Sequence, residues 1–147
     1  VVNYKAFKNG DLDYVKDEVR EGTSMGIDEG LVVKWIIESA ALTSDEIAEL
    51  TSLIRDVVID TVGEQKASDV FVKTSTGFYK PEDGGPGGAT IDDVSIMSLN
   101  AGPLKVKASG GIYSREDLEK MIDAGASRIG TSAGLEIIKG EKANTDY

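Results

Sequence analysis

Two short segments of the chain each carry a lysine within a run of residues typical of a strand. Residues 70–77 contain Lys73, residues 104–111 contain Lys107, and both runs end on glycine. The β-branched and aromatic residues around these lysines favour strands, in which an ammonium group is seldom fully buried unless it is paired. If the two strands are neighbours, burial and like charge favour loss of a proton, which makes one amine a nucleophile suited to Schiff-base chemistry. Alternatively, each lysine extends its charge into water from a strand end.

The elements that must position these lysines alternate along the chain. Expected strands cover residues 31–38, 70–77 and 127–132 and the run around Lys107, and a strand end is expected at residues 1–4. Helices are expected at residues 12–25, 43–61, 91–100, 114–123 and 133–139, several of them preceded by Ser or Thr as N-caps. This alternation predicts an α/β fold with βα units and a parallel sheet, which both doubly wound and barrel folds satisfy.

Composition narrows the classes of function. The 147 residues are 40% hydrophobic and carry a net charge of −10, which predicts one domain and argues against nucleic acid or an anionic membrane as a partner. The sequence has no cysteine and no histidine, so thiol chemistry and the usual general base are excluded, and we expect no metal site. No apolar run reaches the roughly 18 residues of a membrane span, and no leader is recognised, so a cytoplasmic protein is predicted. The sequence begins with Val1 and not with an initiator methionine, so a piece of a longer protein is one expectation.

Two further segments differ in composition from the predicted elements. Residues 78–89 form a long loop rich in glycine and proline, which is expected to be functional or mobile and, in a barrel, to lie over the active face. Residues 140–147 are polar and are expected to be a flexible tail.

Several motifs carry a resemblance to a known family. Residues 72–78, 106–112 and 128–132 resemble the three signature strands of deoxyribose-phosphate aldolase, in that family's order, and residues 36–38 and 3–11 are similar to two further segments. The resemblance implies a (β/α)8 TIM barrel, of which residues 1–147 form one partial domain, roughly the C-terminal half from the end of strand four to helix eight. Half a barrel leaves open edges, so upstream sequence, a partner chain or a homo-oligomer is expected to cover them.

The resemblance also implies an activity: reversible cleavage of 2-deoxy-D-ribose 5-phosphate to D-glyceraldehyde 3-phosphate and acetaldehyde, without a cofactor, in deoxyribonucleotide catabolism. It implies that Lys73 is the Schiff-base nucleophile, and that Lys107 lowers the pKa of its neighbour and assists proton transfer. The family's strand-four aspartate would precede Val1 and is absent from the sequence. Glu38 could polarise the site or simply cap a helix or face a loop, and Lys34 could face inward or extend into water.

Glycines at three strand ends resemble a phosphate cradle, because backbone N–H groups approach a ligand closely where no Cβ intervenes. The residues expected to bind the substrate and its phosphate are Thr76, Gly77, Gly110, Gly111, Gly130 and Ser132. Tight turns alone would also explain these glycines. The sequence departs from the family at Tyr113, where arginine is common, and at Ala133, where a second serine is common, so phosphate affinity is the least secure of the inherited properties.

Two other interpretations stay open. The chain is an incomplete half-barrel that has no activity alone and binds a phosphosugar or a partner subunit, or it is a Schiff-base aldolase of altered substrate range. The missing aspartate motivates the first, and Tyr113 and the long loop motivate the second.

Overall fold

The computed structural model describes residues 1–82 and 84–140. Its strands are β1 (Val33–Ile36), β2 (Val70–Lys73), β3 (Lys105–Ser109) and β4 (Ala126–Gly130). Its helices are α1 (Tyr4–Lys8), α2 (Leu12–Asp28), α3 (Ser44–Ala67), α4 (Ile91–Asn100), α5 (Arg115–Asp123) and α6 (Gly134–Lys139), and a 3₁₀ helix η1 spans Ser39–Ala41.

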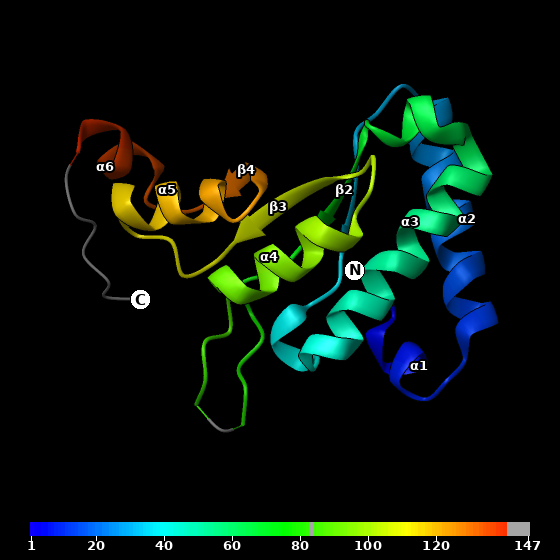
Figure 1. The fold of residues 1–147 in the computed structure, drawn as a ribbon, viewed down its shortest axis with the longest axis horizontal. Coiled ribbons are helices and arrows are strands. Elements are labelled where there is room, and N and C mark those ends of the chain that lie inside the picture. The colour runs from blue at the N-terminus through cyan, green and yellow to red at the C-terminus, as the bar shows by residue number, and fades with distance from the viewer. Residues whose placement is uncertain (83, 141–147) are drawn as a thin grey trace.

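The four strands form one parallel sheet in the order in which they occur in the sequence, β1-β2-β3-β4. A helix follows each strand (Figure 1). The helix α2 packs against β1, α3 against β2, α4 against β3 and α5 against β4. The predicted α/β class with a parallel sheet is therefore confirmed. Consecutive neighbours joined by helices are the arrangement of a barrel arc, because a doubly wound sheet reverses its strand order in the middle.

Side-chain caps fix where several helices begin. Thr43 accepts a hydrogen bond from the backbone of Glu46, whose carboxylate accepts one from Thr43 in return, and Ser114 and Asp117 repeat this reciprocal arrangement at α5. The helix α3 extends beyond the predicted end, to Ala67. Its backbone breaks at Gly63, where φ is 78°.

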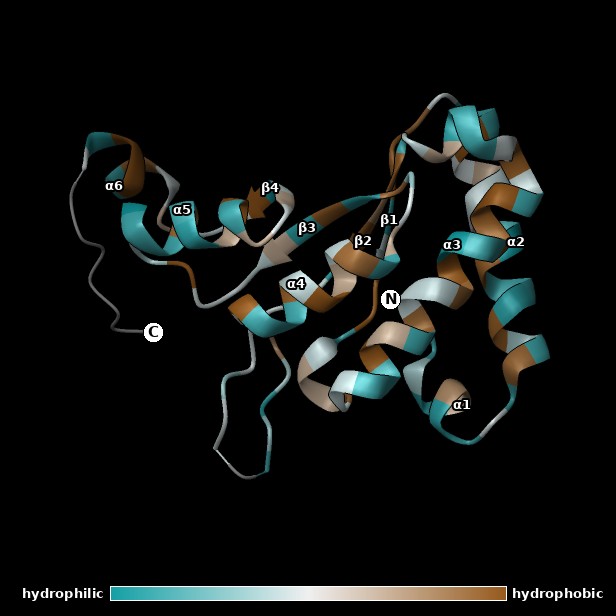
Figure 2. Ribbon diagram, viewed as in Figure 1, coloured by the Kyte–Doolittle hydropathy of each residue, from teal (hydrophilic) through white to brown (hydrophobic). Residues whose placement is uncertain are grey.

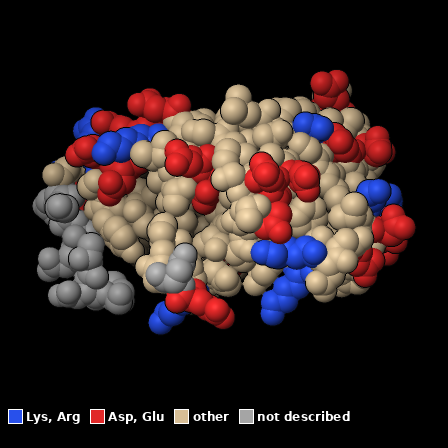
Figure 3. Space-filling model, turned by 60° about the horizontal axis from the view of Figure 1, so that its bottom comes forward, with Lys and Arg blue, Asp and Glu red and all other residues tan. Residues whose placement is uncertain are grey.

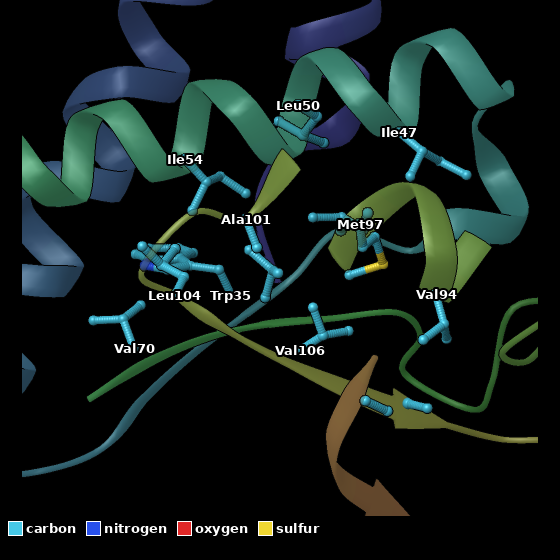
Figure 4. Close-up of a cluster of buried hydrophobic side chains, with 14 of the residues drawn as sticks. Trp35, Ile47, Leu50, Ile54, Val70, Val94, Met97, Ala101, Leu104 and Val106 are labelled. Carbon is cyan, nitrogen blue, oxygen red and sulfur yellow. The ribbon is translucent and has the colours of Figure 1, made fainter. Parts of the chain in front are cut away.

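The core lies between the helices and one face of the sheet. Figure 4 shows Ile47, Leu50 and Ile54 of α3 with Val94 and Met97 of α4, packed over Trp35, Val70 and Val106 from the strands. The indole N–H of Trp35 donates to the hydroxyl of Thr23 on α2 at 3.0 Å, which satisfies the one polar atom of this large side chain. Figure 2 shows the matching brown stripes along the inner sides of α2 and α3.

The opposite face of the sheet is cationic. Register and alternation place Lys34, Phe71, Lys73, Lys105, Lys107 and Arg128 on this face, which we call the cationic sheet face. Phe71 is 4% exposed, because the Arg128 guanidinium lies 4.4 Å and the Lys105 ammonium 5.8 Å from its ring centre. Across the described ranges, none of these cations forms an ion pair.

Some predicted boundaries differ from the structure. At residues 1–4 the expected strand end is represented only by the Val2 N–H, which donates to the Ile36 carbonyl at 3.0 Å, because the Asn3 side chain caps α1 and a helix begins at Tyr4. The strand expected at 31–38 is confined to Val33–Ile36, since Glu38 has a left-handed backbone. The other strands are shorter or shifted by a few residues, a normal uncertainty of element ends. Apart from Gly140, the expected tail lies outside the described residues.

On the face shown in Figure 3, acidic side chains are spread among fewer basic ones, in keeping with the net charge of −10. In the part of the chain that the structure describes, no helix is long and apolar enough to cross a membrane.

Candidate active site

A cavity of about 620 Å³ lies where β2, β3 and β4 end. Eight residues expected from the sequence to act in catalysis or substrate binding line it: Lys73, Thr76, Gly77, Lys107, Gly110, Gly111, Gly130 and Ser132. The carboxyl ends of parallel strands meet at one edge of a sheet, so residues scattered over almost sixty positions are brought together here. The two other candidates, Lys34 and Glu38, do not line this cavity.

Lys73 and Lys107 come from neighbouring strands at the same height. Their α-carbons are register partners, so both side chains leave the same face of the sheet, and both are half-buried. Both also line the one cavity, so neither amine lies on the helix side of the sheet. The two lysine side chains therefore enter one cavity from neighbouring strands.

The electrostatic environment acts on Lys107. Burial, followed by the positive charges of Lys73, Lys34 and Arg128, lowers the pKa of the Lys107 amine from its ordinary value of 10.5. Lys34 acts on the Lys107 amine through its charge. Its own side chain is exposed, and its ammonium donates to the Val32 carbonyl at 3.3 Å. The Lys107 amine therefore gives up its proton more readily than an isolated lysine.

A buried threonine fixes the relative height of the two lysine-bearing strands. The Thr74 hydroxyl accepts a hydrogen bond from the Ser109 N–H at 3.0 Å and donates to the Ser109 carbonyl at 3.3 Å. The N–H of Thr74, the residue after Lys73, donates to the Lys107 carbonyl at 3.1 Å. The strand ends are thus tied together beside the cavity.

Glu38 holds the turn that follows β2. Glu38 is 3% exposed, and its carboxylate accepts hydrogen bonds from the Thr76 N–H at 3.1 and 3.3 Å and from the Thr76 hydroxyl at 2.5 Å. The Thr76 oxygen in turn accepts from the Phe78 N–H at 3.2 Å. Glu38 has a φ of 57°, uncommon for a residue with a Cβ, and this backbone directs its side chain toward Thr76. The carboxylate therefore supports the wall of the cavity from outside.

Glycine is required at two positions beside the lysines. A Cβ on Gly130 would lie 2.3 Å from the Ser109 hydroxyl and 3.0 Å from Cε of Lys107, so a larger residue would displace the Lys107 side chain. Gly110 has a φ of 82° and packs against Gly88 of the long loop, with 3.0 Å between its would-be Cβ and the Gly88 Cα.

Four residues not expected as ligands also line the cavity: Lys80, Ser109, Ile112 and Thr131. Ser109, Ile112 and Thr131 stand in or next to the predicted motifs, so proximity could have indicated them. Lys80 comes from the long loop, and only its place three residues after Gly77 could have drawn attention to it. Tyr113, noted from the sequence as a replacement for arginine, lines the cavity too.

Comparison with known proteins gives consistent matches, although no protein-family model matches the sequence. The chain is 42% identical over 143 residues to the deoxyribose-phosphate aldolase of Thermococcus gammatolerans, an alignment that covers 97% of this chain and 56% of that protein. The solved structure described as "QR15, an Aldolase" matches with a TM-score of 0.72 and 35% identity, over 95% of this chain and 55% of that one. A tetrameric deoxyribose phosphate aldolase from Aeropyrum pernix matches with a TM-score of 0.66 and 30% identity, over 87% of this chain and 49% of that one.

These matches and the parallel sheet confirm the predicted fold, part of a (β/α)8 barrel. The chain spans about half the length of these proteins, between 49% and 56%.

Proposed function

We propose that this chain, which resembles the deoxyribose-phosphate aldolases over nearly its whole length, is part of a class I aldolase that works through a lysine imine. Its reaction is the reversible cleavage of 2-deoxy-D-ribose 5-phosphate to D-glyceraldehyde 3-phosphate and acetaldehyde, in cytoplasmic deoxyribonucleotide catabolism. The observation that carries the proposal is the register pairing of Lys73 with Lys107 inside one cavity.

In the proposed reaction, the neutral Lys73 amine attacks the aldehyde carbon of the open-chain sugar, and loss of water leaves an iminium ion. The iminium then accepts the electron pair of the bond between C2 and C3, while the C3 hydroxyl gives up its proton. Glyceraldehyde 3-phosphate leaves, and the remaining enamine is protonated and hydrolysed to acetaldehyde and free lysine. The lowered pKa of Lys107 suits it to take and return these protons.

Substrate binding is assigned to the neutral part of the cavity wall. Gly77, Gly110, Gly111 and Gly130 leave their backbone accessible, and the hydroxyls of Thr76 and Ser132 add further donors, so a phosphate could be bound without a metal. The other strands of the barrel, from upstream sequence or from a partner chain, would cover the cationic sheet face.

Borohydride trapping tests the imine. The full polypeptide that contains these residues is incubated with acetaldehyde, reduced with borohydride and mapped by mass spectrometry. We expect an added ethyl group on Lys73, which Lys73→Met abolishes and Lys66→Met, on the exposed end of α3, leaves in place. Labelling confined to surface lysines, or none at all, would contradict the proposal.

A second candidate is a half-barrel that binds a phosphosugar or a partner subunit without turning over substrate. It is favoured by the cationic sheet face, whose side chains have no ion pairs among the described residues, and by the limited share of the relatives that the chain spans. Binding of 2-deoxyribose 5-phosphate without any trapped imine would support this candidate over the first.

A further inference from the structure

The charges lining the cavity divide into two groups. Of the cavity-lining residues that the structure describes, three are cationic, Lys73, Lys80 and Lys107, and none is acidic. Lys73 and Lys107 are register partners on strands, whereas Lys80 enters from the loop after β2. A second cavity of about 580 Å³ adjoins the first and shares Lys80 and Tyr113 with it, so Lys80 stands where the two cavities meet.

The loop that carries Lys80 is anchored at its base. The Ala89 N–H donates to the carbonyls of Ser109 and Gly110, at 3.0 and 3.1 Å. A Cβ on Gly88 would lie 2.5 Å from the Gly110 carbonyl carbon, and one on Gly87 would lie 2.2 Å from the Tyr79 carbonyl oxygen. The backbone just before Lys80 is therefore packed against the returning end of its own loop, beside the end of β3.

The substrate of the proposed reaction carries a phosphate with a charge between about −1.5 and −2 at neutral pH, the range of a phosphate monoester. One lysine of the pair becomes the imine nitrogen and the other transfers protons, so neither is free to hold this charge throughout the reaction. Lys80 is exposed and, within residues 1–82 and 84–140, has no ion pair. Among the lining residues it is the cation that the chemistry leaves available.

We propose that Lys80 binds the substrate's phosphate group and thereby sets the preference for phosphorylated over unphosphorylated sugars. The phosphate would lie against Gly110 and Gly111, with its charge met by the Lys80 ammonium as a point charge. This inference rests on the proposed function for its substrate class but assigns the anion to a residue outside the resembling motifs.

The test uses two probes on the full polypeptide, at constant ionic strength because surface charge is screened by salt. Inorganic phosphate is titrated by calorimetry, and kcat and KM are measured for 2-deoxyribose 5-phosphate and for 2-deoxyribose. Lys80→Gln should weaken phosphate binding and raise the KM for the phosphorylated sugar by about 10-fold or more, the scale of a lost charged hydrogen bond. The KM for the unphosphorylated sugar should stay the same, Lys80→Arg should restore most of the affinity, and Lys66→Gln should change nothing.

Unchanged phosphate binding in Lys80→Gln would overturn the inference, as would equal losses for both sugars. Acetaldehyde carries no phosphate, so borohydride trapping in Lys80→Gln should match the unaltered protein. If the unaltered protein itself forms no imine, the proposed function fails, and the phosphate titration alone still decides the role of Lys80.

Discussion

Lys73 and Lys107 are register partners on the neighbouring parallel strands β2 and β3, and Arg128 of β4 is the next partner in the same row. Adjacent strands lie only about 4.8 Å apart, so three positive charges stand side by side across the cationic sheet face. Each charge disfavours its neighbours, and no carboxylate among the described residues forms an ion pair with them. This row of charges therefore lowers the stability of the folded chain and contributes to the lowered pKa of the Lys107 amine.

Replacing Lys107 with methionine should raise the free energy of unfolding at neutral pH. Methionine keeps most of the length of the lysine side chain and removes a half-buried charge, and the gain should be about 0.2–1 kcal/mol, the usual range for cross-strand pairs. The lowered pKa of Lys107, caused by burial and by its cationic neighbours, means that the folded chain releases this proton at lower pH than the unfolded chain does. The destabilisation caused by the Lys107 charge is therefore present in full at pH values below the folded-state pKa of Lys107.

As the pH rises from that lowered value toward 10.5, the unfolded chain holds the proton longer, so the unaltered protein gains stability and the advantage of Lys107→Met shrinks. Urea denaturation at pH 7 and at several alkaline values measures this. Lys66→Met, at the exposed end of α3, is the matched control, and its effect should not follow the same course. An advantage that grows with pH would contradict the lowered pKa.

The sequence was sufficient to predict the parallel α/β arrangement, because each strand is a local apolar run and each break is marked by glycine, proline or a cap. Eight residues of the candidate site could be named for the same reason, since they stand at strand ends. The role of Glu38 could not be predicted. The left-handed backbone of Glu38 directs its carboxylate to Thr76, a residue 38 positions further along the chain. Such a contact exists only after β1 and β2 have paired.

The position of Lys80 at the cavity could not be predicted from the sequence either. A lysine in a loop rich in glycine and proline has no periodicity that fixes its direction, and only the packing of Gly87 and Gly88 against the loop and β3 brings it to the cavity. The helix expected to end at residue 61 continues as α3 to Ala67, beyond the break in its backbone at Gly63.

Glu38→Ala should lower the free energy of unfolding by about 1–3 kcal/mol, because the Thr76 N–H loses its acceptor in a partly buried turn. Glu38→Gly removes the same hydrogen bonds but relieves the positive φ, so it should cost less than Glu38→Ala. Urea denaturation of both variants measures the difference. Glu49→Ala, an exposed glutamate on α3, should stay within about 0.5 kcal/mol of the unaltered protein. A loss no larger for Glu38→Ala than for Glu49→Ala would show that the carboxylate does not hold the turn.

Two helical glycines should respond oppositely to alanine. A Cβ on Gly22 of α2 would lie 2.7 and 2.8 Å from the rigid indole of Trp35, whereas one on Gly134 of α6 meets nothing within 4 Å. Gly22→Ala should therefore be less stable than Gly134→Ala by about 1–3 kcal/mol, the cost of overpacking. Gly134→Ala should gain up to about 1 kcal/mol from helix propensity. Thermal and urea denaturation of the pair compare them, and equal stabilities would mean that Trp35 can move aside.

Two buried threonines offer a sharper comparison, because valine has the same shape without the hydroxyl. Thr74 and Thr51 are both 0% exposed, yet the Thr74 hydroxyl bonds to Ser109, while the Thr51 hydroxyl has no hydrogen-bond partner among the described residues. Thr74→Val should cost about 1–3 kcal/mol, since the Ser109 N–H loses its acceptor, and Thr51→Val should be neutral or stabilising.

The Thr74 and Thr51 variants also distinguish an effect on stability from an effect on imine formation at Lys73. Thr74 ties β2 to β3 beside the lysines, so Thr74→Val should also reduce trapping of the imine at Lys73, measured as the fraction of protein labelled per unit time under conditions where the variant stays folded. Thr51 lies on α3, away from the cavity, and Thr51→Val should label at the original rate. Equal labelling in the two variants would show that the alignment of the lysines does not depend on the Thr74 hydroxyl.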